Sequence, residues 1–190
     1  KGLYQALSRE QPGVSEKFMT YEENRCLYYL AVPTHYTGLL CDTVTLQSVE
    51  ELITESALAF DFVLIDGSGE LTNPVSSTGL WMAERIFTLH KPSICAQMWL
   101  QGVSDFIKEL HIGEKQVHLL RNPNGSFDTR IYKSITDCNF TYELPHVKRA
   151  EELENAGKPL YYFSDRQCKQ YKKVLEEIAG QLCGGGQHEK

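Results

Sequence analysis

Residues 60–70 read F-D-F-V-L-I-D-G-S-G-E. From Phe60 to Ile65 every position except Asp61 is apolar, so a strand made from this run would be apolar on both faces. Such a strand is typical of a parallel sheet that lies between two layers of helices. The run ends in Asp66, and Gly67-Ser68-Gly69 follows as a turn. We therefore predict a central, buried, parallel strand with a carboxylate at its carboxyl end, where open α/β sheets bind ligands.

Strand-like and helix-like patterns alternate along most of the chain. Such alternation implies right-handed crossovers between parallel strands, with helices on both faces of the sheet. We predict an α/β fold of three layers, α/β/α, with a mainly parallel sheet. The other predicted strands are Arg25–Val32, Arg85–Leu89, Gln116–Leu120 and Asn139–Leu144, with a brief extended segment at Phe18–Met19. The predicted helices are Lys1–Ser8, a helix behind Ser48, Pro74–Ala83, Ser93–Leu110, Phe127–Ile135, Val147–Ala156 and Asp165–Leu182.

Local signals place the ends of several of these helices. Ser48 is a predicted N-cap, and Glu51, three residues later, completes a capping box. Ser93 is the predicted N-cap of the long helix that follows it. Gly157 is expected to end the helix before it.

The composition is ordinary for a globular protein. Of the 190 residues, 42% are hydrophobic and 23% are charged. We expect one domain over residues 1–182 and a flexible tail over residues 183–190. The formal net charge of −6 argues against a surface that binds phosphate backbones, so no specific nucleic-acid partner is expected.

The six cysteines form no C-x-x-C pair and no cluster with histidine. This spacing predicts neither a disulfide framework nor a zinc site, and it favours a reducing, cytoplasmic compartment. No apolar run reaches the roughly 20 residues that cross a bilayer. The predicted closing helix has mixed charges and a modest apolar stripe, which consists of Tyr171, Val174, Leu175, Ile178 and Leu182. These features favour packing within the domain over direct membrane binding.

Four ordered motifs carry a family resemblance. They are V-L-I-D-G-S-G (63–69), H-L-L-R-N (118–122), Y-E-L-P (142–145) and E-N-A-G-K-P-L (154–160), followed by one terminal helix. This set resembles the ParA/MinD superfamily of P-loop ATPases, and within it the CpaE/TadZ branch that is linked to pilus assembly and polar localisation. The resemblance covers roughly residues 1–182. It implies a P-loop NTPase-like fold, ATP and Mg²⁺ as cofactors, and ATP-linked homodimerisation that positions a larger assembly through protein partners.

The resemblance also implies a role for Asp66. In the family a strand-end aspartate holds the magnesium ion, usually through water, and Asp66 matches it. Gly69 matches the glycine that family members carry soon after this aspartate, while Gly67-Ser68 replaces the segment that usually bears a proline. The alternative from the residues alone is that Asp66 only caps the following turn.

Two further matches concern the adenine ring. The family places an asparagine after a strand to contact adenine, and the loop at its next strand-end proline packs nearby; Asn122 and Pro145 match these positions. Pro123 stands where a basic residue often follows the asparagine. The alternative reading of Asn122 is a turn residue, since N-P-N-G forms a turn without any ligand.

The phosphate-binding motif of the family is absent from these 190 residues, which contain neither G-x-x-x-x-G-K-[ST] nor K-G-G-x-G-K-[ST]. In the family that loop follows the first strand, so we expect it to precede Lys1 and the chain alone not to hydrolyse ATP. The alternative function is a non-catalytic scaffold that keeps the fold for protein contacts. A small hydrolase using Ser68 is the remotest alternative, because D-G-S-G-E lacks the G-x-S-x-G spacing.

Overall fold

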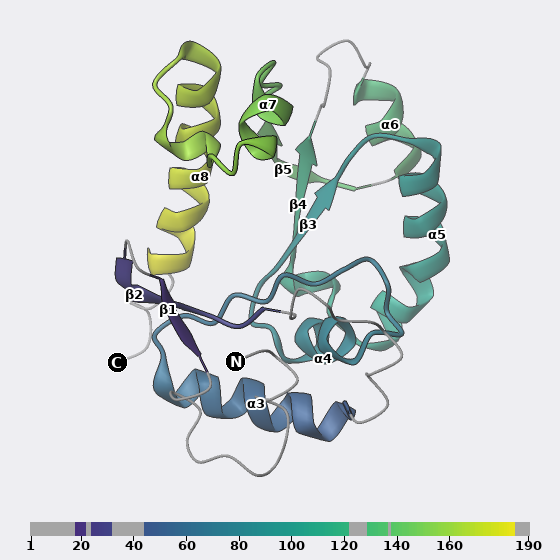
Figure 1. Cartoon of the computed structure of the whole chain (residues 1–190). Coiled ribbons are helices and arrows are strands. Elements are labelled where there is room, and N and C mark those ends of the chain that lie inside the picture. Colours follow the sequence, from purple (N-terminus) through teal and green to yellow (C-terminus); the bar gives the residue numbers. More distant parts are fainter. Residues whose placement is uncertain (1–17, 22–23, 32–43, 122–128, 137, 185–190) are drawn as a thin grey trace. The chain divides into compact units, whose positions relative to one another are not determined.

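The computed structural model describes residues 18–21, 24–31, 44–121, 129–136 and 138–184 (Figure 1). The chain divides into two compact units, Lys1–Glu84 and Arg85–Lys190. Each unit has a hydrophobic cluster of its own.

The first unit combines a β-hairpin with two helices. β1 (Met19–Tyr21) and β2 (Asn24–Tyr29) pair antiparallel, and α3 (Leu46–Ala59) packs against α4 (Pro74–Met82). β2 therefore confirms the first part of the strand predicted at 25–32. Val49 and Leu52 of α3 are the buried centre of the unit. The half-buried apolar side chains around them are Phe18, Leu30, Val44, Ile53, Phe60 and Val75.

The amino end of α3 corrects one prediction. Thr45, and not Ser48, is the N-cap: its Oγ1 accepts from the Ser48 amide at 3.1 Å, and Ser48 Oγ accepts from the Thr45 amide at 3.1 Å. The capping box thus joins Thr45 to Ser48, because Ser48 is buried at the third helical position and can reach back. Glu51 lies beyond the box and accepts from Gln47 Nε2 at 2.9 Å instead.

The predicted central strand at Phe60–Ile65 is wrong. These residues form no strand, and the side chains of Phe62 and Leu64 are 58% and 83% exposed. The segment packs at both of its ends: the Phe60 ring meets Phe18 edge-on with centroids 5.0 Å apart, and Ile65 lies against α4 at Gly79, where an added Cβ would be 3.1 Å from Ile65 Cγ2. A strand needs ladder hydrogen bonds from a neighbour, and apolar composition does not supply that neighbour.

The second unit is built on a parallel sheet. Its strands are β3 (Ile86–His90), β4 (Gln116–Arg121) and β5 (Phe140–Leu144), in the spatial order β3-β4-β5. They confirm three predicted strands, with ends that differ by one residue. The helical segments of the unit are α5 (Ile94–Glu109), η2 (Gly113–Lys115), α6 (Thr129–Thr136), α7 (Ala150–Asn155), η3 (Leu160–Tyr162) and α8 (Arg166–Gly184).

Helices cover both faces of this sheet, with α8 on one side and α5 and α6 on the other (Figure 1). On the α8 side the buried residues Leu119, Tyr142 and Leu144 pack against three residues of the predicted apolar stripe, Tyr171, Val174 and Ile178. On the other side the hydroxyl of Tyr132, from α6, contacts His90. The predicted three-layer α/β/α architecture with a parallel sheet is therefore confirmed.

Several helix ends follow the sequence signals. Ser93 Oγ accepts from the Ala96 amide at 3.1 Å and caps α5 as predicted. α8 continues to Gly184, two residues into the predicted tail. The predicted helix Lys1–Ser8 and residues 185–190 lie outside the described residues. None of the helices in the described ranges combines the length and hydrophobicity that a bilayer crossing requires.

Candidate functional site

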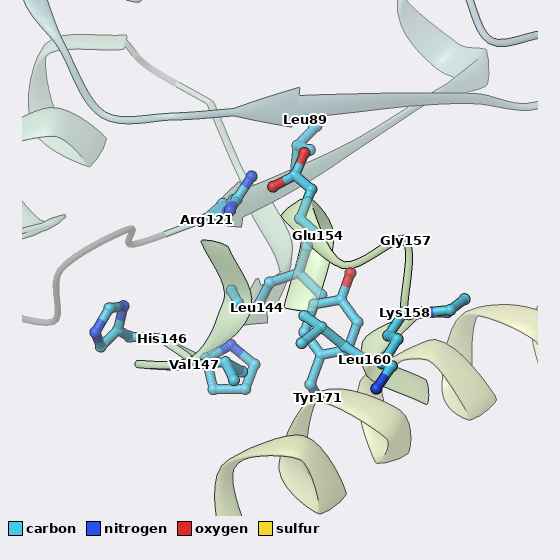
Figure 2. Close-up of a pocket in the computed structure, with 13 residues that line it drawn as sticks. Leu89, Arg121, Leu144, His146, Val147, Glu154, Gly157, Lys158, Leu160 and Tyr171 are labelled. Carbon is cyan, nitrogen blue, oxygen red and sulfur yellow. The ribbon is translucent and has the colours of Figure 1, made fainter. Parts of the chain in front are cut away.

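A cavity of about 400 Å³ lies at the carboxyl ends of the parallel strands in the second unit (Figure 2). Leu89 near the end of β3, Arg121 at the end of β4 and Leu144 at the end of β5 all line it. The remaining lining residues come from the segment between β5 and α8: Pro145, His146, Val147, Ala150, Glu154, Gly157, Lys158, Pro159, Leu160 and, from α8 itself, Tyr171. Its volume falls within the roughly 300–1,000 Å³ of small-molecule sites.

The end of α7 shapes one wall of this cavity. Gly157 has a φ of 64°, and the Gly157 amide donates to the Glu154 carbonyl at 2.9 Å. The Lys158 amide donates to the Leu153 carbonyl at 2.8 Å, which completes a Schellman motif. This turn confirms the prediction that Gly157 ends the helix. After this turn the chain continues through Pro159 and Leu160, which line the cavity.

The lining combines apolar walls with a few polar groups. Leu89, Leu144 and Leu160 supply aliphatic surface, and the lining also holds the charged residues Arg121, Glu154 and Lys158. Arg121 and Glu154 are exposed to solvent, and Figure 2 shows the charged ends of these two side chains directed toward the same side of the cavity. Apolar walls with a small number of placed polar groups are the usual make-up of a small-molecule site.

The turn after Asp66 belongs to the first unit and is held by α4. The Ser68 amide donates to Ser76 Oγ at 3.0 Å, and the two hydroxyl oxygens lie 3.3 Å apart. Asn73 Oδ1 caps α4 by accepting from the Val75 amide at 2.9 Å. Within the described residues, the Asp66 carboxylate forms neither a hydrogen bond nor an ion pair, so the turn is held by Ser76 and not by Asp66.

A second polar cluster lies inside the second unit. His90 Nε2 is 3.0 Å from His118 Nδ1, and His90 Nδ1 is 3.2 Å from the Tyr132 hydroxyl. Burial and the neighbouring His118 lower the pKa of His90 to about 4, and burial lowers the pKa of His118. Both imidazoles are therefore neutral near pH 7. The described residues contain no group of three or more side chains that could hold a metal ion.

Two solved structures share this architecture. No protein-family model matches the sequence, and no curated protein matches it significantly. The MinD cell division protein of Aquifex aeolicus matches with a TM-score of 0.73 over 97% of this chain and 75% of its own, at 11% identity. The fold is that of the MinD and ParA ATPases. A ParA family ATPase from Chlorobium tepidum TLS matches with a TM-score of 0.68 over 94% of this chain and 72% of its own, at 15% identity.

Within this MinD/ParA-type fold, the predicted site residues divide between the two units. Pro145 lines the cavity at the end of β5. Asn122 lies outside the described residues, directly after Arg121 of the cavity wall. Asp66 and Gly69 belong to the turn of the first unit. Their assigned roles stay predictions.

Sequence reasoning missed the polar residues of the cavity, which are Arg121, His146, Glu154, Lys158 and Tyr171. One signal was available for Arg121, since a charged residue that ends the apolar strand H-L-L-R marks the carboxyl edge. No such signal existed for Glu154, which stands among other acidic residues in A-E-E-L-E-N. Tyr171 was assigned to the packing stripe of the closing helix, and it lies at the border between the packed core and the cavity.

Proposed function

We propose that this chain is the base-binding part of a ParA/MinD-like ATPase of the CpaE/TadZ kind, which positions or assembles a larger cellular machine through ATP-linked dimerisation. The observation that carries the proposal is the cavity lined by Pro145 at the carboxyl edge of the parallel sheet, in a fold shared with MinD and ParA ATPases. Open α/β sheets bind their ligands at this edge.

The residues present fit two parts of Mg²⁺–ATP. The apolar walls of the cavity, which include Pro145, suit the faces of an adenine ring, and Asn122 follows Arg121 of the cavity wall in the sequence. Asp66 offers a solvent-exposed carboxylate with no partner among the described residues, and a carboxylate suits a hydrated magnesium ion. When bound, the metal would screen the charge of the phosphates. Gly69 remains the proposed counterpart of the glycine that follows this aspartate in the family.

The cellular setting follows from the same proposal. No disulfide joins the cysteines that the structure describes, and the spacing of the cysteines in the sequence favours a reducing, cytoplasmic compartment. We propose that the protein forms a homodimer and binds further protein partners. The proposal includes neither a specific nucleic-acid partner nor direct binding to a membrane. Sedimentation of the full chain with and without Mg²⁺–ATP tests the dimer: the proposal requires a larger species when the nucleotide is present.

Calorimetry with Mg²⁺–ATP tests the binding itself. The proposal requires saturable binding that depends on magnesium and that Asp66→Ala abolishes or strongly weakens. Asp61→Ala is the matched control, because Asp61 is an exposed carboxylate of the same segment. An equal loss of Mg²⁺–ATP affinity in both variants would show that only the charge of the segment matters, and it would reject the role of Asp66.

A non-catalytic scaffold is the second candidate function. The observation in its favour is that the sequence contains no glycine-lysine phosphate loop. The exposed Phe62 and Leu64 of the first unit would then serve protein contacts. Absence of any nucleotide binding by the full chain, together with a stable fold, would favour the scaffold over the ATPase.

A further inference from the structure

Helix α5 has two apolar faces, and the packing of its own chain uses only one of them. That face carries Leu100, Val103 and Ile107, which are half-buried in the second unit. The opposite face carries Ile94 and Met98, which are 77% and 66% exposed and lie one turn apart on the same side of the helix. Large apolar side chains that stay in water opposite the packed face favour contact with another molecule.

Gly102 continues this exposed face by one more turn. It lies four residues after Met98 inside the helix, where glycine costs up to about 1 kcal/mol relative to alanine. The fold does not explain the glycine: its φ is not positive, and an added Cβ would meet no atom of the described residues within 4 Å. A glycine there does leave room for the close approach of a second helix.

The charges at the two ends of this face have opposite signs. Lys91 is exposed just before the helix, and Asp105 and Glu109 are exposed near its carboxyl end. Lys108 pairs with Asp105 at 3.4 Å, but their side chains are 77% and 91% exposed, so the pair contributes little and leaves Asp105 open to a second cation. The face therefore runs from positive through apolar to negative, which matches a second copy of itself in the opposite direction.

We propose that the α5 stripe, formed by Lys91, Ile94, Met98, Gly102 and Asp105, joins two copies of the chain with their α5 helices antiparallel. With the twofold axis at Met98, Ile94 of each copy packs over Gly102 of the other, and Lys91 of each copy faces Asp105 of the other. The spacing supports this register. Ile94 and Gly102 each lie four residues from Met98, and Lys91 and Asp105 each lie seven residues from it. A parallel pair would bring like charges together.

The size of the contact indicates a weak and reversible dimer. α5 has 16 residues, so the helix is about 24 Å long and about 10 Å wide. A pair of such helices buries less than the roughly 800 Å² per partner of a standard stable interface. The contact involves no nucleotide, and it is therefore distinct from the ATP-linked dimer of the proposed function.

Sedimentation equilibrium of the full chain without nucleotide, over about 1–100 μM protein, measures the pairing. The wild type should show a dimer whose population rises with concentration. Gly102→Gln places a long side chain where Ile94 of the second copy would pack, and it should weaken the dimer at least about 10-fold. Its fold should be intact, because glutamine is a better helix former than glycine.

Gly180→Gln is the matched control. Gly180 is also an exposed helical glycine, in α8, and its added Cβ would meet nothing within 4 Å among the described residues. The control should dimerise as the wild type does. Thermal melts at the lowest protein concentration should show that neither substitution lowers the melting temperature of the monomer.

Charge reversal tests the antiparallel register. Lys91→Glu and Asp105→Lys, each made alone, set like charges opposite each other in both halves of the contact and should weaken the dimer about fivefold. The variant that carries both substitutions should recover the wild-type affinity, because opposite charges again face each other. Within one copy the two residues lie at opposite ends of the helix, so independent structural effects would add instead of cancelling.

Three results would overturn the α5 contact. They are a wild type that is monomeric at every concentration without nucleotide, an equal loss of dimer in Gly102→Gln and Gly180→Gln, and a double charge variant that dimerises no better than the single ones. A chain that dimerises only with Mg²⁺–ATP would reject the α5 contact and keep the proposed function. A dimer that forms without nucleotide and does not respond to Mg²⁺–ATP would do the reverse.

Discussion

His90 Nε2 lies 3.0 Å from His118 Nδ1, inside the layer between the parallel sheet and α6. The strand register explains the contact: His90 pairs with Leu120 and Thr88 with His118, so the two histidines are diagonal neighbours on one face of the sheet. The Phe140 ring meets His90 edge-on, with centroids 5.1 Å apart. One imidazole must donate and the other accept, which requires the accepting ring to be neutral.

This pair makes stability depend on pH. The pKa of His90 is lowered from 6.5 to about 4, first by burial and then by His118. Between these values the unfolded chain binds more protons than the folded one, so stability is full above about pH 6.5 and falls as the pH drops toward 4. The shift of about 2.5 units corresponds to a loss of up to about 3 kcal/mol. Urea denaturation between pH 4 and pH 8 measures it.

His90→Gln isolates this contribution from that of the carboxylates. Glutamine does not titrate, so the variant should lose stability less steeply than the wild type between pH 6.5 and pH 4. His111→Asn is the control, because His111 is exposed and its φ of 52° suits asparagine. An identical slope in His90→Gln and the wild type would contradict the assignment.

Tyr132→Phe should lower the free energy of unfolding by about 1–2 kcal/mol. The hydroxyl lies 3.2 Å from His90 Nδ1, and the tyrosine is only 4% exposed, so its loss leaves a buried nitrogen without that partner. Burial, with a smaller contribution from Cys138, raises the pKa of this hydroxyl, which keeps it protonated as a donor. Tyr162→Phe, at a side chain that is 73% exposed, should change stability by less than about 0.5 kcal/mol.

Two helical glycines should respond to alanine with opposite signs. At Gly102 of α5 an added Cβ meets nothing within 4 Å, so Gly102→Ala should stabilise by about 0.5–1 kcal/mol through helix propensity. At Gly79 of α4 the Cβ would lie 3.1 Å from Ile65 Cγ2 and 3.3 Å from Ile65 Cδ1. Gly79→Ala should therefore destabilise by about 1 kcal/mol despite the same gain in propensity. Equal stabilisation of both variants in thermal melts would show that Ile65 moves aside freely.

Ser76→Ala should loosen the turn behind Asp66. Ser76 Oγ accepts from the Ser68 amide at 3.0 Å, and its removal should speed hydrogen exchange of that amide about fivefold, for a bond worth about 1 kcal/mol. Under the proposed function, Ser76→Ala should also weaken the binding of Mg²⁺–ATP. Ser77→Ala is the neighbouring control, since Ser77 Oγ donates to the Asn73 carbonyl at 3.1 Å and does not contact the turn. Unchanged exchange at Ser68 would refute the role of Ser76.

The local elements of this protein could be predicted from short stretches of sequence. β3, β4 and β5 follow from apolar runs rich in β-branched and aromatic residues, and their ends differ from the prediction by one residue. The cap at Ser93 and the helix end at Gly157 follow from side chains that act within a few residues of their own backbone. Alternation of these elements was enough to predict a parallel sheet between helices.

Contacts between residues that are distant in sequence determined the features that could not be predicted. The run Phe60–Ile65 has the composition of a buried strand, but a ladder requires a neighbouring backbone that the run does not encode. The lowered pKa of His90 comes from a partner that the strand register brings near. Arg121 and Glu154 line one cavity only because β4 and α7 end at the same edge of the unit. Propensity acts along the chain, whereas burial, pairing and the lining of a cavity depend on residues distant in sequence that the fold brings together.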